Sequence, residues 1–483
     1  MERRLTPERL ATLVGAFHRT PAYRGLRLAL QELIGDGRIP IGTRLPSERA
    51  VALALQVSRN TVTRVYGDLV AAGFAEARVG AGTFAVVPEH RRRAHDHALH
   101  ALGAAKAGDG GIDLNCAASA ATPGVAAAYA RALDALPAWL GTDGYLPSGL
   151  PPLQAAIADA YTRRGLPTEP AQVVVTSGAL SALAVVARAM TRAGDRVMLE
   201  TPVYSNAIEA LKLGGARLVA SPMGDALAEP GWDLDGIEAT LRQTAPHLAY
   251  LIPDFQNPTG FLMPDAMRAE YAAMLRAART IPIIDEALQG TALTDAPMPA
   301  PFAAHARDAI TLGSASKLFW GGLRVGWIRA PRERVEGIVR ARVQMDLGTS
   351  VFDQLVVAEL MRTPGVADAR RAQLRARRDA LVAALREHLP DWRFRTPDGG
   401  LTLWIHLPHG SATQFAADME PHGVHLAPGP VFSVEGGADQ WLRLPYAWPE
   451  ERLQDAVRRM AAVWASAPAA SARRRPPSRR LVA

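Results

Sequence analysis

Lysine is scarce in this chain, and one of its three copies lies among other residues that could do chemistry. The 483 residues contain only Lys106, Lys212 and Lys317. Lys317 follows a Gly-Ser-Ala-Ser run and precedes Arg324 by seven positions. A lysine amine can form a Schiff base with an aldehyde, and a guanidinium can bind a phosphate through two hydrogen bonds. The pair therefore predicts a site that binds a carbonyl compound covalently, with an anion beside it.

An acidic residue and a turn of small residues lie upstream, each at the end of an apolar run. Asp285 ends the run Ile281–Ile284, where a low dielectric would strengthen its pairing with a cation. A second apolar run, Val173–Val175, is followed by three small residues that open a helical pattern: Ser177, Gly178 and Ala179. Backbone N–H groups at such a helix start can bind a dianion. Ser314, close to Lys317, would add a hydroxyl.

Together with the segment Asp254–Gly260, these residues resemble the pyridoxal phosphate (PLP) site of fold-type I aminotransferases, over residues 112–465. The resemblance implies that PLP is the cofactor, that Lys317 forms the Schiff base with it, and that Asp285 faces its pyridine nitrogen. It implies that the phosphate is held by Ser177, Gly178, Ala179, Ser314 and Arg324.

The same resemblance assigns four further side chains. Tyr204 would stack on the pyridine ring, and Asn257, followed by a cis bond to Pro258, would lie beside the ring hydroxyl. Tyr145 would reach across a dimer interface to the phosphate of the partner, and Arg443 would bind a ligand carboxylate. For Arg443 the alternative is a structural arginine at a strand end.

One position departs from the aminotransferase pattern. Leu288 lies where active enzymes of this fold commonly carry a tyrosine that donates a hydrogen bond to the ring oxygen. Because leucine has no donor, the sequence predicts that the cofactor binds but that catalysis is weak. This departure favours a sensor over an efficient enzyme.

Residues 1–88 have the pattern of a winged helix-turn-helix. Ser47 and Ser58 are good N-caps for two helices that are separated by a short break. Residues 74–87 alternate like two short strands around a Gly-Ala-Gly turn. The segment resembles the winged helices of the GntR regulators along its whole length.

A recognition helix reads DNA bases with its N-terminal end, where arginine can contact guanine and asparagine can contact adenine. The resemblance implies DNA contacts by Arg49, Ser58, Arg59, Asn60, Thr61, Arg64 and the backbone of Gly80. Family members often carry a basic residue at the position of Thr63, so Arg64 alone would serve that phosphate.

The combination of the two parts resembles the MocR-type branch of the GntR regulators. From residue 112, apolar runs alternate with amphipathic helices, which predicts an α/β domain with a mostly parallel sheet. After about residue 380 a helix, Arg378–Leu389, and short strands predict a smaller α+β lobe. The predicted domains are 1–88 (DNA binding), 89–111 (flexible linker), 112–466 (PLP-binding, aminotransferase-like) and 467–483 (disordered basic tail).

Composition agrees with this organisation and excludes several other classes. A net charge of +7 permits nucleic-acid binding, and 48% hydrophobic residues suffice for a large core. The single cysteine, Cys116, excludes an intrachain disulfide and fits a reducing cytoplasm. No apolar run is long enough to span a bilayer, and no Walker loop, dinucleotide fingerprint or metal motif occurs. Three linker histidines, His95, His97 and His100, have no companion ligands, so we expect no metal.

We therefore predict a cytoplasmic, PLP-dependent transcriptional regulator. It would bind a double-stranded DNA operator as a head-to-tail homodimer and sense an amine or amino acid by aldimine exchange at Lys317. The alternative is a catalytically active PLP-dependent aminotransferase with an accessory DNA-binding domain, against which Leu288 argues. PLP itself is also open as the signal.

Overall fold

The computed structural model describes residues 4–35, 38–78, 80–86 and 111–466. The predicted tail over 467–483 and, apart from Gly111, the predicted linker lie outside the described residues, as do the three linker histidines.

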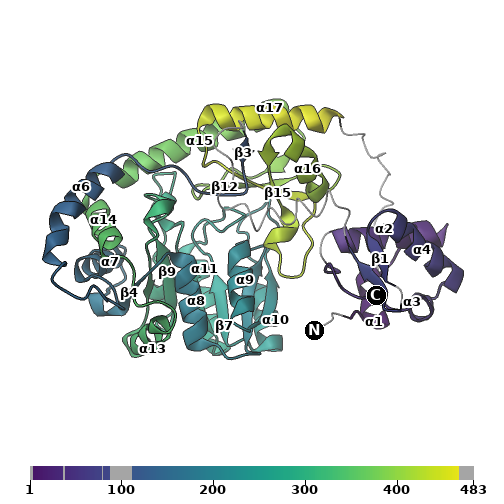
Figure 1. Cartoon of the computed structure of the whole chain (residues 1–483), viewed down its shortest axis with the longest axis horizontal. Helices are drawn as coiled ribbons and strands as arrows, with labels where there is room; N and C mark the ends of the chain where they lie inside the picture. The colour runs from purple at the N-terminus through teal and green to yellow at the C-terminus, as the bar shows by residue number, and fades with distance from the viewer. Residues whose placement is uncertain (1–3, 36–37, 79, 87–110, 467–483) are drawn as a thin grey trace.

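Four helices and a hairpin make up the N-terminal part (Figure 1). They are α1 (Pro7–Val14), α2 (Ala22–Gly35), α3 (Glu48–Leu55), α4 (Arg59–Ala71), β1 (Ala75–Arg78) and β2 (Gly82–Ala85). Both predicted caps are confirmed, because the Ser47 hydroxyl accepts from the Ala50 N–H at 3.4 Å and the Ser58 hydroxyl accepts from the Thr61 N–H at 3.0 Å. Gln56 closes the turn between α3 and α4 in the left-handed conformation, at φ 53°. The result is a helix-turn-helix followed by a two-stranded wing.

A seven-stranded sheet forms the centre of the larger part, in the order β4-β10-β9-β8-β7-β5-β6. Its strands are β4 (Val173–Thr176), β5 (Arg196–Thr201), β6 (Arg217–Pro222), β7 (Leu248–Leu251), β8 (Ile281–Asp285), β9 (Ile310–Ser314) and β10 (Gly326–Arg329). Strand β10 is antiparallel to both of its neighbours, whereas the other pairings are parallel. The predicted mostly parallel sheet is confirmed.

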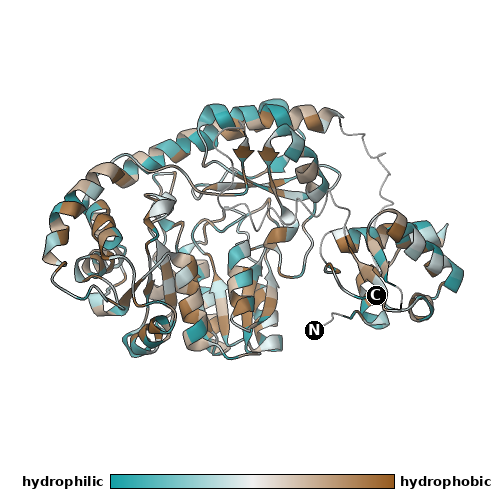
Figure 2. Cartoon of the chain, in the orientation of Figure 1, coloured by the Kyte–Doolittle hydropathy of each residue, from teal (hydrophilic) through white to brown (hydrophobic). Residues whose placement is uncertain are grey.

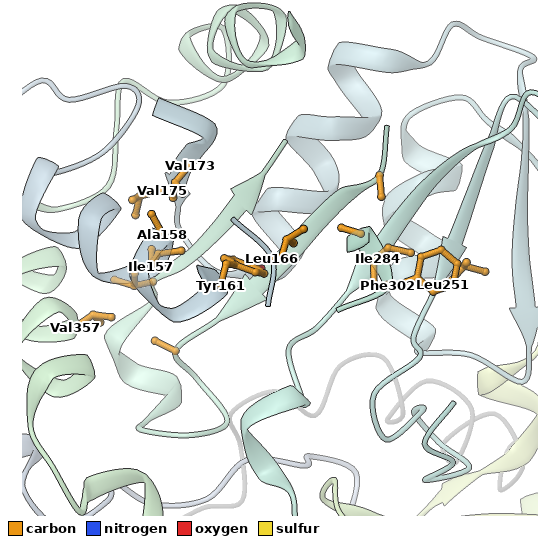
Figure 3. Close-up of a cluster of buried hydrophobic side chains, with 14 of the residues drawn as sticks. Ile157, Ala158, Tyr161, Leu166, Val173, Val175, Leu251, Ile284, Phe302 and Val357 are labelled. Carbon is orange, nitrogen blue, oxygen red and sulfur yellow. The ribbon is translucent and has the colours of Figure 1, made fainter. Parts of the chain in front are cut away.

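Helices cover both faces of this sheet, because alternate residues of each buried strand point to opposite sides. Val173 and Val175 join one hydrophobic cluster, which Figure 3 shows in part, and Val174 joins a second. The first cluster packs against α6 (Val125–Ala135), α7 (Pro151–Arg163), α10 (Leu234–Thr244), α11 (Asp265–Ala277), α12 (Phe302–His305) and α14 (Val351–Arg362). The second packs against α8 (Ala179–Met190), α9 (Ser205–Leu213) and α13 (Arg332–Val343). Figure 2 shows the contrast between the apolar strands and the hydrophilic outer sides of these helices.

A smaller lobe follows, built on a four-stranded sheet in the order β11-β12-β15-β14. Its strands are β11 (Arg393–Phe394), β12 (Thr402–His406), β14 (Ala427–Pro428) and β15 (Trp441–Pro445). Its helices are α15 (Val366–His388), α16 (Ala412–Met419) and α17 (Glu450–Ser466). Short 3₁₀ helices complete the larger part: η1 (Leu136–Ala138), η2 (Pro170–Gln172), η3 (Gln289–Thr291), η4 (Gly321–Leu323), η5 (Glu420–His422) and η6 (Gly429–Phe432).

Helix α15 starts earlier than the sequence pattern predicts. The predicted helix from Arg378 is only its second half, because the first half is rich in arginine and shows a weak apolar stripe. Two of these arginines are nevertheless buried and donate to backbone carbonyls, Arg370 to Phe319 at 2.9 Å and Arg377 to Ala447 at 2.8 Å. Buried guanidiniums bound in this way replace the apolar side chains that a helical stripe ordinarily shows.

The first strand after residue 110 belongs to the smaller lobe. Strand β3 (Ile112–Asp113) pairs in parallel with β13 (Val424–His425), more than three hundred residues later. The sequence gives no signal for this pairing, since each strand has only two residues. It fixes where the segment that follows β3 must lie.

Within residues 4–35, 38–78, 80–86 and 111–466, every helix is too short or too polar to cross a membrane.

The central sheet sets the stability of the larger part. Leu199→Ala, in β5, is expected to lower the free energy of unfolding by roughly 2–5 kcal/mol, because Leu199 is fully buried and its loss leaves a cavity. Leu213→Ala is the matched control: this side chain is 88% exposed and should change stability by less than about 0.5 kcal/mol. Urea unfolding of the full chain, followed by circular dichroism, measures the stability of both variants. Equal urea midpoints for the two variants would contradict the assignment of Leu199 to the core.

Candidate functional site

All strands of the central sheet except β10 run in the same direction and end at one edge, where a cavity of about 340 Å³ opens. Ligand sites of open α/β sheets characteristically lie at this carboxyl edge. Eight of the predicted cofactor residues line the cavity: Gly178, Ala179, Tyr204, Asn257, Asp285, Ser314, Lys317 and Arg324. An adjoining hollow of about 70 Å³ is lined by Arg443 and shares several of these residues. The fold thus brings together residues that are far apart in the chain.

Two predicted residues stand apart from the cavity wall. Ser177 touches the site only through its backbone carbonyl, which accepts a hydrogen bond from Arg324 Nη2 at 3.1 Å. Tyr145 is 61% exposed and does not line the cavity of its own chain. Its assignment to a partner's phosphate therefore remains a prediction.

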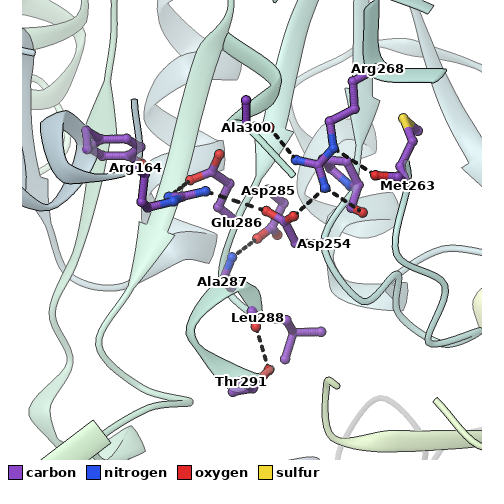
Figure 4. Close-up of polar contacts among 12 residues, drawn as sticks. Arg164, Asp254, Met263, Arg268, Asp285, Glu286, Ala287, Leu288, Thr291 and Ala300 are labelled. Carbon is purple, nitrogen blue, oxygen red and sulfur yellow. Dashed lines mark hydrogen bonds and ion pairs between the residues drawn. The ribbon is translucent and has the colours of Figure 1, made fainter. Parts of the chain in front are cut away.

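Asp285 is the acid of the cavity, and it is buried at the end of β8 (Figure 4). Its Oδ2 accepts from the Tyr250 hydroxyl at 2.5 Å and its Oδ1 accepts from the Ala287 N–H at 2.8 Å. Burial raises the pKa of Asp285, and these hydrogen bonds oppose the rise. A cation placed against Asp285 would therefore be held strongly.

Lys317 is held in the same cavity by a backbone contact. Its Nζ donates to the carbonyl of Ala117 at 2.8 Å, on the segment that follows β3. Burial lowers the pKa of Lys317; Arg443 and Arg324 lower it further, whereas Asp285 raises it. A lowered pKa increases the fraction of free amine, which is the nucleophilic form.

Two glycines form the floor where the predicted phosphate cradle lies. A Cβ atom on Gly178 would lie 2.9 Å from Arg324 Nη2, and a Cβ on Gly326 would lie 2.5 Å from the Gly178 carbonyl carbon. Gly178 also has φ 101°, a conformation that residues with side chains rarely adopt. Only glycine leaves room for the guanidinium of Arg324 to reach the start of α8.

Arg443 lines the adjoining hollow. It is 5% exposed, its Nη1 donates to Asn257 Oδ1 at 3.5 Å, and its Nη2 donates to the carbonyl of Asn115. Its Nε is buried without a hydrogen-bond partner. Burial lowers the pKa of Arg443 to about 10. The role of Arg443 in binding a ligand carboxylate, with a structural arginine as the alternative, remains a prediction.

These residues fit a pyridoxal phosphate. The cavity offers a buried amine, a buried carboxylate, a glycine-lined helix start with a guanidinium, and the aromatic side chain of Tyr204. The bond between Asn257 and Pro258 is cis, as the resemblance implies.

The predicted DNA-contacting residues lie in α3 (Arg49), at the N-terminal half of α4 (Ser58 to Arg64) and in the turn of the wing (Gly80). Arg49, Ser58, Arg59, Asn60, Arg64 and Gly80 are exposed, and Thr61 is half-buried. Glu48 restrains this surface: it lies 3.8 Å from Arg59 Nε and accepts from the Thr63 hydroxyl at 2.6 Å. Arg64 stacks over the ring of Tyr23, with 3.6 Å from Cζ to the ring centroid.

Comparison with known proteins identifies both parts. Residues 127–460 match the family described as aminotransferase class I and II, and residues 22–85 match the bacterial regulatory proteins of the gntR family. A probable rhizopine catabolism regulatory protein, MocR of Rhizobium meliloti, is 30% identical over 396 residues, which cover 77% of this chain and 78% of the relative.

The chain belongs to the class I and II aminotransferases and, through its GntR domain, to the MocR-type regulators.

A curated sequence and a solved structure from Thermus thermophilus, both of an aminoadipate aminotransferase, bear on the cofactor. A 2-aminoadipate transaminase is 34% identical over 330 residues, covering 66% of this chain and 79% of the enzyme. The solved α-aminoadipate aminotransferase LysN, complexed with N-(5'-phosphopyridoxyl)-L-leucine, is 30% identical with a TM-score of 0.68, and the match covers 78% of this chain and 96% of that enzyme. The larger part of the regulator is thus a fold-type I domain whose cofactor is PLP.

The sequence pattern does not predict some of the residues that line the cavity. For Tyr250, the one indication in the sequence is a polar hydroxyl group within an otherwise apolar strand. For Cys116 and Ala117 the sequence gives no indication, because these residues reach the cavity through the pairing of β3 with β13. Leu288 lies on the cavity wall, where it offers no hydrogen bond to a ligand.

The neighbours of Lys317 predict how its pKa responds to substitution in cofactor-free protein. Arg443→Met removes a nearby positive charge and should raise the pKa of Lys317, which leaves less free amine at neutral pH. Asp285→Asn removes a negative charge and should lower that pKa, which leaves more free amine. The rate at which Lys317 is acylated at about pH 8, measured by mass spectrometry, should therefore fall in Arg443→Met and rise in Asp285→Asn, by roughly two- to ten-fold.

Lys212 provides the internal reference for these rates, since it pairs with Glu209 at 3.1 Å on the surface of α9. Equal labelling of Lys317 in all three proteins would contradict the electrostatic account of the cavity.

Proposed function

We propose that this protein is a DNA-binding regulator whose PLP domain senses an amine or amino acid. Lys317 would hold PLP through its amine, and an effector amine would compete with Lys317 for the aldehyde that PLP supplies. The observation that carries this proposal is the placement of Lys317 and Asp285 in one cavity, in a chain whose α4 exposes Arg59 and Asn60 to solvent.

Each side chain of the cavity has a proposed task. PLP supplies an aldehyde carbon that binds amines covalently and a ring that withdraws electrons. Asp285 would keep the proton on the ring nitrogen, and Tyr250 would orient Asp285. Tyr204 would cover the ring, and Asn257 would lie beside its hydroxyl. The phosphate would be held by Ser314, Arg324 and the backbone N–H groups of Ser177, Gly178 and Ala179.

Arg443 is proposed to bind the carboxylate of an amino-acid effector. Arg443, Asn257 and Lys317 line the same hollow. A carboxylate bound to the guanidinium there would place the effector's amine against the cofactor carbon.

The segment that follows β3 links this chemistry to the DNA-binding domain. Ala117, which accepts from Lys317, lies six residues after Gly111, where the described part of the domain begins. When an effector frees the lysine amine, the carbonyl of Ala117 is its available acceptor. A ligand that binds one arrangement of this segment more tightly shifts the population toward that arrangement. A difference of about 1.4 kcal/mol in binding free energy shifts the ratio of the two arrangements tenfold.

The functional unit is proposed to be a head-to-tail homodimer. Tyr145 projects into solvent, and the side chains of Leu140, Met345 and Leu347 are further exposed apolar groups of the same domain. A partner subunit that covers these side chains would receive Tyr145 at the partner's phosphate site.

Lys317→Ala tests the sensor proposal directly. The variant should lose the visible absorbance of lysine-bound PLP and the response of operator affinity to amines, because no covalent exchange is left. Its operator affinity should still fall linearly with salt on a log–log plot, because the exposed arginines of α4 are untouched. Fluorescence anisotropy on operator DNA, with and without a panel of amino acids, measures both properties.

Two outcomes would contradict the proposal. If DNA binding disappears together with the cofactor, the division between the two domains is wrong. If PLP alone produces the full change in operator affinity, and amines add nothing, the signal is the vitamer itself.

An active aminotransferase is the second candidate, favoured by the 34% identity to a transaminase. Leu288 opposes it, so wild-type protein should convert PLP to pyridoxamine phosphate slowly in single-turnover assays. Leu288→Tyr should speed this conversion by roughly ten-fold, since it adds one hydrogen bond near the ring. Leu180→Tyr, at another leucine of the cavity wall, is the control. Rapid, complete conversion by wild-type protein would favour the enzyme.

A further inference from the structure

Two loops follow strands β7 and β8, and Asn257 and Asp285, at or beyond these strand ends, are proposed to contact the cofactor ring. Asn257 belongs to the first loop, which also contains Asp254, and Asp285 is the last residue of β8, directly before Glu286 in the second loop. Asp254 and Glu286 are both buried, and neither lines the cofactor cavity. Each of these ring-contacting loops therefore contains an acid that is directed elsewhere.

Arg164 joins these two acids. It caps the C-terminus of α7, and its Nη1 pairs with Glu286 Oε2 at 2.7 Å while its Nη2 lies 3.9 Å from Asp254 Oδ2 (Figure 4). One planar guanidinium thus spans from one ring-contacting loop to the other. Lysine, a point charge, could not keep both contacts in this geometry.

A second arginine anchors only one of the loops. Arg268 Nη2 pairs with Asp254 Oδ1 at 2.7 Å, and its other donors bind the carbonyls of Met263 at 2.9 Å and Ala300 at 3.0 Å. Since Arg268 is fully buried, it fixes Asp254 to the body of the domain. Arg164 is then the arginine that ties the loop of Glu286 to that anchor.

The charges of the four side chains balance, with two carboxylates against two guanidiniums. Burial raises the pKa of Glu286, and the guanidinium of Arg164 opposes that rise. Removal of Arg164 would leave Glu286 as a buried acid without its ion-pair partner, which a protein relieves by moving or protonating the group. Either response acts on the residue next to Asp285.

We propose that Arg164 is a positioning residue for the cofactor, which fixes Asn257 and Asp285 relative to one another from behind the cavity. This inference rests on the cofactor contacts proposed above. Titration of the wild-type protein with PLP, in the experiment described below, tests those contacts separately.

A second cavity makes Arg164 accessible to small molecules. It has a volume of about 320 Å³ and is lined by Arg164, Glu286 and Tyr161 together with apolar side chains such as Leu360 and Met361. An alkylguanidinium could enter it and replace a truncated arginine side chain.

The test compares Arg164→Ala with Arg163→Ala in the full-length chain. Arg163 is the adjacent, exposed residue of α7 and takes no part in the ion pairs that Arg164 makes with the two loops, so it controls for the loss of charge. Arg164→Ala should weaken PLP binding by roughly ten-fold or more. It should also shift the pH midpoint of the visible absorbance of bound PLP, because Asp285 no longer holds the ring nitrogen in place. Arg163→Ala should match wild-type protein in both measurements.

Chemical rescue adds a readout that general destabilisation would not produce. Millimolar ethylguanidinium should restore PLP affinity and the absorbance midpoint of Arg164→Ala, and should leave Arg163→Ala unchanged. If Arg164→Ala does not fold, Arg164→Lys and Glu286→Gln serve instead, and both should shift the midpoint in folded protein.

A purely structural role predicts a different pattern. If Arg164→Ala melts at a lower temperature yet binds PLP with wild-type affinity and midpoint, the proposal is overturned. Wild-type values for both Arg164→Lys and Glu286→Gln would overturn it equally.

Discussion

The burial of a single carboxylate is the constraint around which the larger domain is organised. Asp285 ends a strand at the centre of a seven-stranded sheet, where water is excluded, and a charge there is costly unless it is paired. Tyr250 and the Ala287 N–H provide part of that pairing. The proposed partner for the rest of its charge is the cationic ring nitrogen of PLP. The same rule applies behind it, where Glu286 and Asp254 are neutralised by Arg164 and Arg268.

A regulator needs its ligand site to act on a second domain, and the chain path supplies a physical route. The segment that follows β3 forms part of the cavity wall and accepts the amine of Lys317 at Ala117. It is also the first described stretch after the DNA-binding domain. In the proposed mechanism, a change at the amine of Lys317 acts on the backbone that leads toward the helix-turn-helix.

The site has the groups that are proposed to bind PLP and lacks the tyrosine that commonly donates to the ring oxygen in active enzymes of this fold. Asp285, Lys317 and Arg324 occupy one cavity, whereas Leu288 puts an apolar side chain on its wall. Binding and turnover place different demands on a site: affinity needs paired charges in the ground state, while rate needs interactions that strengthen in the transition state. In this regulator, more residues of the cavity are suited to binding PLP than to accelerating turnover.

The sequence by itself determined the two-part organisation, the caps of the helix-turn-helix, the mostly parallel sheet and eight of the residues that line the cavity. These features depend on short-range patterns: apolar runs, capping residues, and polar residues placed where strands end. Only the tertiary structure decided the rest. The first half of α15 is hidden because buried arginines replace its apolar stripe, and Tyr250 and Arg164 gain their roles from partners 35 and 122 residues away. The pairing of β3 with β13 leaves no trace in either segment, because two-residue strands carry no periodicity. Together with hydrogen bonds from Arg443 and Arg370 to the backbone of the same segment, it places Ala117 beside Lys317.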